Sequence, residues 1–277
     1  MAASNLTIRI ATAIVAVPLL LALLYLGPAW AWLAFLLVVA IVTVNELFAM
    51  THGEDKVVRV VGVGMLWAVM VSVYLWPSDP RWLLSSALML PFAAVVLGLW
   101  RLGPIPKSAL HVAAACFGPL WLGAGIGSIA LLRTYPNGAS LVVLSLVLAW
   151  SSDTGGYAAG RLFGKHKLYE AVSPKKTIEG AVGGVAGAII GALIMRAVTL
   201  HDLPMMHAVF LGLFGSIGGV LGDLGESLLK RSTGVKDSGG IVPGHGGMLD
   251  RIDAVVITGP LTLLYLVWTG VKPLVNP

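Results

Sequence analysis

Acidic and basic side chains gather in one short stretch of an otherwise apolar sequence. After Asp223 come Glu226, Ser227, Lys230 and Arg231, at offsets of 3, 4, 7 and 8 residues. On an α-helix these offsets lie along one face, so the stretch presents carboxylates and cations together. Mg²⁺ prefers oxygen ligands and commonly combines one or two carboxylates with substrate phosphates. The stretch therefore predicts a site for magnesium and phosphate groups.

A second polar segment follows after a short gap. Its charged residues and its one histidine are Lys236, Asp237, His245, Asp250, Arg251 and Asp253. Asp250 and Asp253 are three residues apart and can share the first turn of a helix. Because a glycine-rich turn separates this pair from the first stretch, the acids of both can converge on one point. We expect Asp223 and Asp250 to be the metal ligands, since they lie nearest the apolar spans.

The cations of the two segments have a matching role. Lys230, Arg231 and Lys236 would hold the phosphate charge that the metal does not cover. His245 lies in the glycine turn, where it would either contact the substrate or shape the loop. The alternative for the whole group is a network of ion pairs that closes a loop.

A third candidate is Asp153, at the end of an apolar run, in the sequence Ser152-Asp153-Thr154-Gly155. A charged side chain within the hydrocarbon costs on the order of 2.5–3.5 kcal/mol on insertion scales, and such residues are functional candidates by default. The alternative is an interfacial residue that pairs with Arg161 or with a nearby lysine.

A fourth candidate is the basic segment 173–179, in which Pro174 suits the approach to a helix start. Lys175, Lys176 and Thr177 would lie at the N-terminus of that helix, an arrangement typical of anion binding. Glu179 could neutralise one of the lysines. The alternative is an orientation signal that contacts lipid headgroups.

The composition decides in which solvent these groups work. Of the 277 residues, 57% are hydrophobic and 11% are charged, with a mean hydropathy of +0.90. Soluble domains carry about 25% charged residues, so water is not the main solvent of this surface. The net charge of +5 comes from cations too few and too clustered to track a nucleic acid, and we expect no nucleic-acid partner. The single cysteine forms no internal disulfide.

Long apolar runs predict the fold class. A helix needs about 20 apolar residues to cross the hydrocarbon. Nine runs qualify: 10–27, 29–50, 60–76, 82–100, 108–132, 141–160, 180–200, 207–229 and 254–271. The sequence therefore predicts an all-α, polytopic transmembrane helical bundle of about nine spans.

The basic residues give this bundle an orientation. Fourteen of the eighteen Lys and Arg residues fall on the side of the membrane that holds the N-terminus. Because cytoplasmic loops carry the excess of Lys and Arg, the N-terminus is expected in the cytoplasm and the C-terminus outside. The two long polar segments, about 161–179 and 230–253, then face the cytoplasm.

Residues 1–107 are expected to form an N-terminal part of about four spans, and residues 108–277 a C-terminal part that carries the active site. Gly183, Gly187 and Gly191 recur every four residues in the seventh span. Small residues at this spacing allow helices to approach closely in lipid. The C-terminal part is therefore predicted to be tightly packed.

The ordered motifs resemble those of a known family. The run from Ser227 to Asp253, with its Lys-Arg, Lys-Asp, Pro-x-His-Gly-Gly and Asp-Arg-x-Asp elements, is similar to the signature of the phosphatidate cytidylyltransferase, or CDP-diacylglycerol synthase, family. The segments around Asp153 and 173–180 resemble further motifs of that family. The likeness covers roughly 145–255, with a weaker match at Asn45-Glu46. Gly156 stands where an alanine is common.

The resemblance implies that CTP and phosphatidate react to give CDP-diacylglycerol and pyrophosphate. It also implies Mg²⁺ with K⁺ beside it, and a homodimer in the cell (inner) membrane. On this basis Lys175, Lys176 and Arg251 would bind triphosphate. Further residues that would bind a substrate or support the metal ligands are Asp153, Thr177, Glu179, Ser227, Asp237 and Asp253. Membrane lipids are the remaining partners, and the active site would face the cytoplasm.

Two rival functions remain open. One is a CTP-dependent cytidylyltransferase or kinase that acts on another, prenol-type membrane lipid. The other is a transporter, because membrane acids and broken helices also mark translocation sites. Transport sites lie near the midplane, whereas these charges crowd one face, which disfavours transport.

Overall fold

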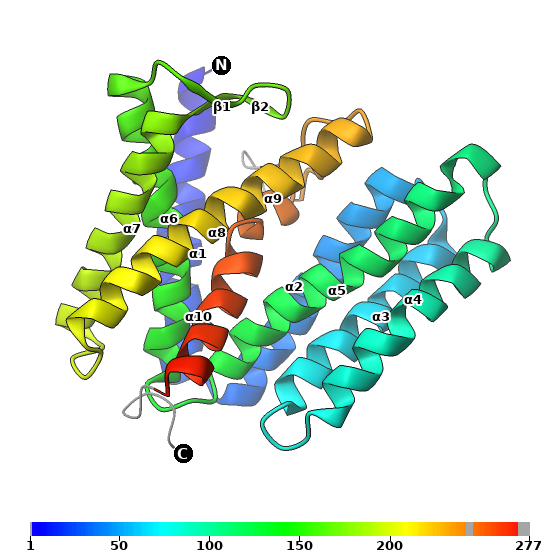
Figure 1. The fold of residues 1–277 in the computed structure, drawn as a ribbon, viewed down its shortest axis with the longest axis horizontal. Helices are drawn as coiled ribbons and strands as arrows, with labels where there is room; N and C mark the ends of the chain where they lie inside the picture. The colour runs from blue at the N-terminus through cyan, green and yellow to red at the C-terminus, as the bar shows by residue number, and fades with distance from the viewer. Residues whose placement is uncertain (1, 242–245, 271–277) are drawn as a thin grey trace. The chain divides into compact units, whose positions relative to one another are not determined.

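The computed structural model of the chain describes residues 2–241 and 246–270, with side chains from residue 14 onward. It is helical almost throughout (Figure 1), which confirms the all-α prediction. The first six helices are α1 (Ala2–Leu26), α2 (Ala29–His52), α3 (Lys56–Leu75), α4 (Arg81–Trp100), α5 (Ser108–Leu132) and α6 (Gly138–Phe163). The remaining four are α7 (Ile178–Val198), α8 (Met205–Ser232), α9 (Leu249–Ile252) and α10 (Val255–Thr269). A 3₁₀ turn, Ile105–Lys107, precedes α5.

Among the described residues, eight helical stretches are long and apolar enough to cross a membrane. They correspond to the second through the ninth predicted span, and the last of them, Leu249–Thr269, joins α9 to α10. The first predicted span, 10–27, overlaps α1 up to its end at Leu26, and the apolar part of α1 with described side chains is Ile14–Leu26. The protein is therefore a multi-pass membrane protein.

The chain divides into two compact units. The first consists of residues 1–131 and 233–251, and the second of residues 132–232 and 252–277. Each unit thus takes in a segment that returns from a distant part of the sequence. The sequence suggested a different division, into an N-terminal part of residues 1–107 and a C-terminal part of residues 108–277, and that division stays a prediction.

The first unit is built around α2, α3 and α5. Phe48, Leu66 and Met70 are fully buried between these helices. Gly62 of α3 faces the ring of Phe48, and a Cβ added there would overlap the ring. Gly123 of α5 approaches the backbone of α3 at Leu66 in the same way. Small residues therefore allow close helix packing in this unit as well.

The second unit is held together by glycine contacts and buried hydroxyl groups. A Cβ added to Gly155 of α6 would overlap the carbonyl oxygen of Gly183 in α7, which confirms the predicted close approach of these helices. The hydroxyls of Ser152 and Ser216 form a hydrogen bond of 2.7 Å between α6 and α8. In lipid, where no water competes, such contacts replace the hydrophobic effect as the source of helix association.

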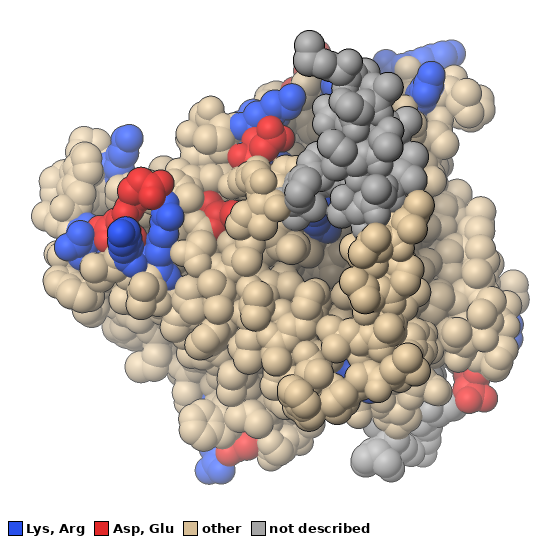
Figure 2. Space-filling view, turned by 180° about the vertical axis from the view of Figure 1, so that it is seen from behind, with Lys and Arg blue, Asp and Glu red and all other residues tan. Residues whose placement is uncertain are grey.

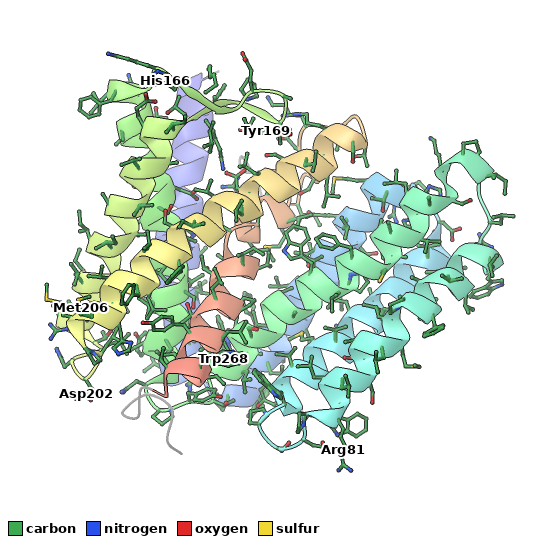
Figure 3. All side chains as sticks on the ribbon, viewed as in Figure 1. Arg81, His166, Tyr169, Asp202, Met206 and Trp268 are labelled. Atoms are coloured by element: carbon green, nitrogen blue, oxygen red, sulfur yellow. The ribbon has the colours of Figure 1, made fainter. Side chains whose placement is uncertain are left out.

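A short β-hairpin joins α6 to α7. Its strands, β1 (Lys167–Tyr169) and β2 (Ser173–Thr177), are antiparallel. Figure 3 shows His166 and Tyr169 beside and in this hairpin, at one end of α7, and Asp202 at the other end of α7, in the connection to α8. Met206 lies in the first turn of α8. Charged side chains occupy only a few places on the face drawn in Figure 2, which is otherwise uncharged. The hairpin contains Lys167, Lys175 and Lys176, and it forms part of the candidate site.

Candidate active site

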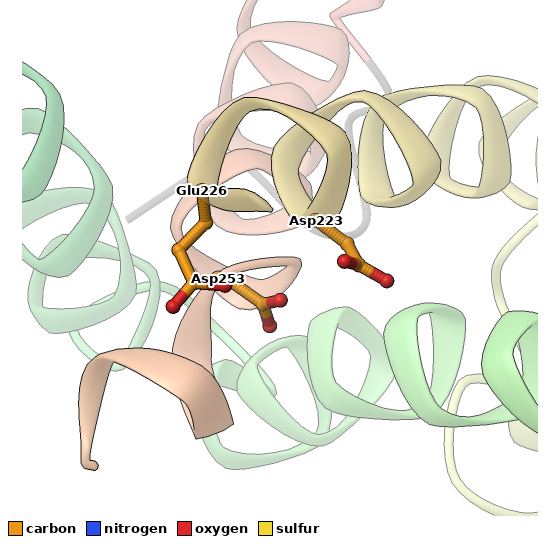
Figure 4. A group of neighbouring side chains, drawn as sticks. All are labelled: Asp223, Glu226 and Asp253. Atoms are coloured by element: carbon orange, nitrogen blue, oxygen red, sulfur yellow. The ribbon is translucent and has the colours of Figure 1, made fainter. Parts of the chain in front are cut away.

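Three carboxylates of the second unit converge at the C-terminal part of α8. Asp223 and Glu226 are one helical turn apart on α8, and Asp253 lies just before α10. One carboxylate oxygen from each lies within 4.8 Å of those from the other two (Figure 4). The backbone of Asp253 approaches Gly222 so closely that a Cβ at Gly222 would contact the Asp253 carbonyl oxygen. The glycine therefore permits the approach that completes the cluster.

Two lysines form ion pairs with two of the three carboxylates of this cluster. Lys176 Nζ lies 2.6 Å from Asp223 Oδ2, and Lys230 Nζ lies 2.6 Å from Glu226 Oε2. Ser227 Oγ donates a hydrogen bond of 3.3 Å to Asp223 Oδ1. Glu226 is almost completely buried, and a buried charge is costly unless it is paired. The acid and base stripe predicted for this helix is thus present as ion pairs and a hydrogen bond.

A cleft of about 450 Å³ opens beside Asp223. Its polar and charged lining residues are Ser152, Asp153, Tyr157, Arg161, Lys175, Lys176, Thr177 and Asp223. The cleft therefore unites three groups that the sequence singled out: the end of α6, the basic strand β2 and the stripe on α8. Arg161 and Tyr157 had been given no substrate role from the sequence, although the i, i+4 spacing from Tyr157 to Arg161 could have indicated a shared face.

The N-terminus of α7 forms one wall of this cleft. Thr177 caps the helix, with its Oγ1 accepting a hydrogen bond of 3.1 Å from the Gly180 backbone N–H. Because Gly160 and Gly180 carry no side chain, α6 can approach the cap, and a Cβ on either would press against Thr177 Oγ1. Thr177 thus fixes the helix end next to the two lysines.

Glu179 has a different environment from the one expected. Its carboxylate accepts hydrogen bonds from the backbone N–H groups of Lys165 and His166, at 3.1 and 3.2 Å. It also lies 2.6 Å from His166 Nδ1. Among the described residues Glu179 does not line the cleft. We therefore interpret it as a residue that fixes the connection between α6 and the hairpin.

An apolar groove of about 290 Å³ adjoins the cleft. It is lined by Leu168, Tyr169, Ala181, Val185, Ser216, Ile217, Val220, Leu221 and Leu224. Three of these residues, Leu168, Ala181 and Val220, also line the cleft. One continuous surface therefore passes from charged groups to apolar side chains.

Asp250 belongs to the first unit, together with Lys236, Asp237 and Arg251. Its Oδ2 accepts hydrogen bonds from the backbone N–H groups of Ser238 and Gly247, at 3.1 and 2.9 Å. The expected sharing of one metal by Asp223 and Asp250 stays a prediction. His245 lies outside the described residues.

The sequence placed Glu226 on the acidic stripe, three residues from Asp223, but did not single it out as a metal ligand. Asp253 had been given only a supporting part. The approach of Asp253 to Asp223 depends on the turn between α9 and α10, and spacing alone does not define that turn.

Comparison with known proteins identifies the protein family. The model of the Cytidylyltransferase family matches residues 7–269. The chain belongs to the cytidylyltransferase family. A relative from Staphylococcus haemolyticus, named phosphatidate cytidylyltransferase, is 33% identical over 262 residues, which are 94% of this chain and 98% of the relative. One of the same name from Staphylococcus epidermidis is 34% identical over 271 residues, 95% of this chain and 99% of the relative.

Family membership confirms the resemblance inferred from the motifs and makes the protein a nucleotidyltransferase. The match covers both units, including the first hundred residues, where the sequence motifs gave little guidance. It also argues against transport as the main activity. The cleft and the acid cluster are thus the candidate active site of a membrane-embedded cytidylyltransferase.

Proposed function

We propose that this protein transfers the cytidylyl group of CTP to phosphatidate, forming CDP-diacylglycerol and pyrophosphate for phospholipid biosynthesis. In this reaction a phosphate oxygen of the lipid attacks the α-phosphorus of CTP. A new P–O bond forms, the bond between the α- and β-phosphates breaks, and pyrophosphate leaves. The observation that carries the proposal is a lysine-lined cleft, with carboxylates at its side, that continues into an apolar groove.

The donor set suits a hard divalent cation. Asp223, Glu226 and Asp253 offer only carboxylate oxygens, which Mg²⁺ and Ca²⁺ prefer and which do not favour soft metals. We assign these three residues as the Mg²⁺ site. The expectation from the sequence that Asp250 also binds the metal, and that K⁺ lies beside Mg²⁺, stays a prediction. When bound, Mg²⁺ would neutralise charge on the phosphate oxygens and on the departing pyrophosphate.

The lysines and Arg161 solve the main difficulty of this reaction, which is to bring two polyanions together. Lys175, Lys176 and Arg161 line the cleft and can place positive charge around the triphosphate. Fixed cations of this kind stabilise the charge that develops during phosphoryl-type transfer. Lys176 already lies against Asp223, so it can contact a phosphate beside the metal site.

A general base is not needed for the attack. The second pKa of a phosphate monoester lies near ~6, so the phosphatidate headgroup is largely a dianion at neutral pH. The lipid oxygen is therefore nucleophilic without losing a further proton to the protein. The residues of the cleft have to position the two substrates and neutralise the charge of their phosphates, and lysine, arginine and carboxylate side chains suit that task.

The apolar groove suits the other half of the lipid. Its lining is almost entirely aliphatic and aromatic, and it shares residues with the charged cleft. An acyl chain in the groove would leave the phosphate headgroup near the lysines. We propose that lipid enters from the membrane and that CTP enters from the cytoplasm, which is the side that the excess of Lys and Arg assigns to this site.

The rival substrate is a prenol-type lipid. The names of the relatives favour phosphatidate. CTP labelled at the α-phosphate separates the chemistries: label that enters the lipid indicates cytidylyl transfer, whereas lipid labelled only from the γ-phosphate indicates a kinase.

The direct test measures pyrophosphate and CDP-diacylglycerol made by the detergent-purified protein from CTP and phosphatidate, with and without Mg²⁺. We expect equal amounts of both products, and only with the divalent cation. Asp223→Asn should lower the rate by more than about 100-fold, beyond the 10- to 100-fold typical of groups that merely support a ligand. Asp202→Asn, in the exposed connection at the other end of α7, is the matched control. Product formation without any divalent cation, or a near-normal rate in Asp223→Asn, would refute the assignment.

A further inference from the structure

Glu46 is a buried carboxylate that the reaction above does not use. It lies on α2, and only 6% of the surface of Glu46 is exposed. Burying a carboxylate is strongly unfavourable unless hydrogen bonds compensate for the lost water. Oε1 of Glu46 accepts a hydrogen bond of 2.9 Å from the Met248 backbone N–H, and Oε2 accepts one of 2.8 Å from that of Leu249. Both donors belong to the same unit and lie about 200 residues further along the chain.

The segment around these donors is shaped to fit the carboxylate. Ser238 Oγ donates a third hydrogen bond, of 3.3 Å, to Glu46 Oε2. A Cβ added to Gly239 would lie 2.6 Å from Oε1, and one added to Gly247 would lie 2.7 Å from Oε2. Such distances are too short for real atoms, so only glycine allows the backbone to reach the carboxylate at both positions. The chain therefore closes on Glu46 from two sides.

A second carboxylate joins the same two sides. Asp250 Oδ2 accepts hydrogen bonds from the backbone N–H groups of Ser238 and Gly247. Glu46 and Asp250 together thus bind two stretches of the chain, one near residue 238 and one near residue 247. Of the two, only Glu46 comes from a membrane-spanning helix remote in sequence, and it fixes the segment to the rest of the first unit.

We propose that Glu46 is a positioning residue for the reaction, holding the segment formed by residues 238–241 and 246–251 in its working conformation. This segment carries Asp250 and Arg251, and it leads within four residues from Leu249 to Asp253 of the acid cluster. A shift of the backbone at Leu249 would pass along the chain to these groups. The inference rests on the proposed function for its effect on the rate, but the anchoring of the segment can be measured without catalysis.

The test compares the full-length wild type with Glu46→Gln in detergent. The variant keeps the shape of the side chain but turns an acceptor into an NH₂ group, which faces a backbone donor. We expect amide hydrogen exchange in peptides covering residues 246–250 to rise about tenfold or more, with little change in α3 and α5. We also expect kcat/KM to fall about tenfold or more, and the Mg²⁺ concentration for half-maximal rate to rise, because positioning groups around metal sites commonly act at this scale.

Two further variants separate positioning from general damage to the fold. Thr43→Val changes a buried polar residue of α2 whose hydroxyl donates to the carbonyl oxygens of Val39 and Ala40 in its own helix, so exchange at 246–250 should stay at the wild-type level. Ser238→Ala removes one of the three donors to Glu46 and should give an intermediate rise.

Three results would overturn the inference. The first is unchanged exchange at 246–250 in Glu46→Gln. The second is a rise of the same size throughout the first unit, which would make the role merely structural. The third is a local rise with unchanged kcat/KM and unchanged Mg²⁺ requirement. An inactive wild type would instead refute the proposed function, and the exchange data would still decide whether Glu46 anchors the segment.

Discussion

At the scale of single residues, the pair Lys230–Glu226 shows how the acid cluster is kept stable. Both side chains are buried, with exposed fractions of 11% for Lys230 and 1% for Glu226. Removing one partner of a buried pair leaves an uncompensated charge and typically costs about 3–5 kcal/mol, whereas removing both is often nearly neutral. The stability of this negatively charged cluster therefore depends on individual lysines that form ion pairs with its carboxylates.

This dependence leads to a stability prediction. Lys230→Met should lower the midpoint of thermal unfolding measured in EDTA, because Glu226 loses its cation. The double variant Glu226→Gln with Lys230→Met should recover most of the loss. Added Mg²⁺ should also raise the midpoint of Lys230→Met, since a ligand that binds only the folded state stabilises it. A double variant less stable than Lys230→Met would contradict this account of the pair.

At the scale of helices and strands, much of the architecture could be predicted because its physical causes are local. The length of each apolar run defines the spans, and the predicted boundaries of α4 and α5 agree with the structure to within one residue. The hairpin β1–β2 could not be predicted, because its short polar strands show no alternation of apolar residues. The link between Glu46 and residues 248–249 could not be predicted either, since no periodic pattern connects them.

Close packing of α6 against α7 gives a prediction for these elements. Gly187→Ala should destabilise the protein by about 1–3 kcal/mol, the usual cost of overpacking, because the added methyl would overlap the Ser151 carbonyl oxygen. Gly64→Ala in α3 is the control, since no atom lies within 4 Å of the methyl that it adds. Thermal unfolding of both variants measures the difference. Equal stability of the two would show that α6 and α7 are not tightly packed.

The link between α3 and α4 predicts a pH dependence. Arg101, at the end of α4, donates from Nε to Asp55 Oδ2 at 2.8 Å and lowers the pKa of that carboxyl. Asp55 also caps α3 through the backbone N–H groups of Val57 and Val58. A lowered pKa in the folded state means that the stabilisation is present above the pKa of the unfolded chain. It is lost as the pH falls through the lower pKa of the folded state.

Asp55→Asn should therefore unfold at a lower temperature than the wild type at neutral pH, and the difference should shrink as the pH falls below the usual range of an aspartate. Unfolding midpoints recorded over that range provide the measurement, with Glu54→Gln, an exposed neighbour, as the control. A difference that stays constant down to the lowest pH would exclude the charged form of Asp55 as its cause.

At the scale of the whole molecule, the distribution of Lys and Arg makes a prediction about sidedness. The hairpin between α6 and α7 should face the cytoplasm, and the connection between α7 and α8 should face the other side. Because the chain has a single cysteine, Cys116→Ser gives a cysteine-free protein into which single cysteines can be introduced for labelling. Cysteine placed at Tyr169 should react with an impermeant thiol reagent only in inverted vesicles, and cysteine at Asp202 only in intact cells. The reverse pattern would place the active site outside.

We propose that Asp223, Glu226 and Asp253 hold the divalent cation of this cytidylyltransferase. Binding of Mn²⁺, a spectroscopic stand-in for Mg²⁺, to the purified protein can be titrated by electron paramagnetic resonance without any turnover. The account predicts that Asp253→Asn weakens binding of Mn²⁺ by about tenfold or more, while Asp202→Asn binds it as the wild type does. If Asp253→Asn bound Mn²⁺ as tightly as the wild type, the cluster would not be the metal site.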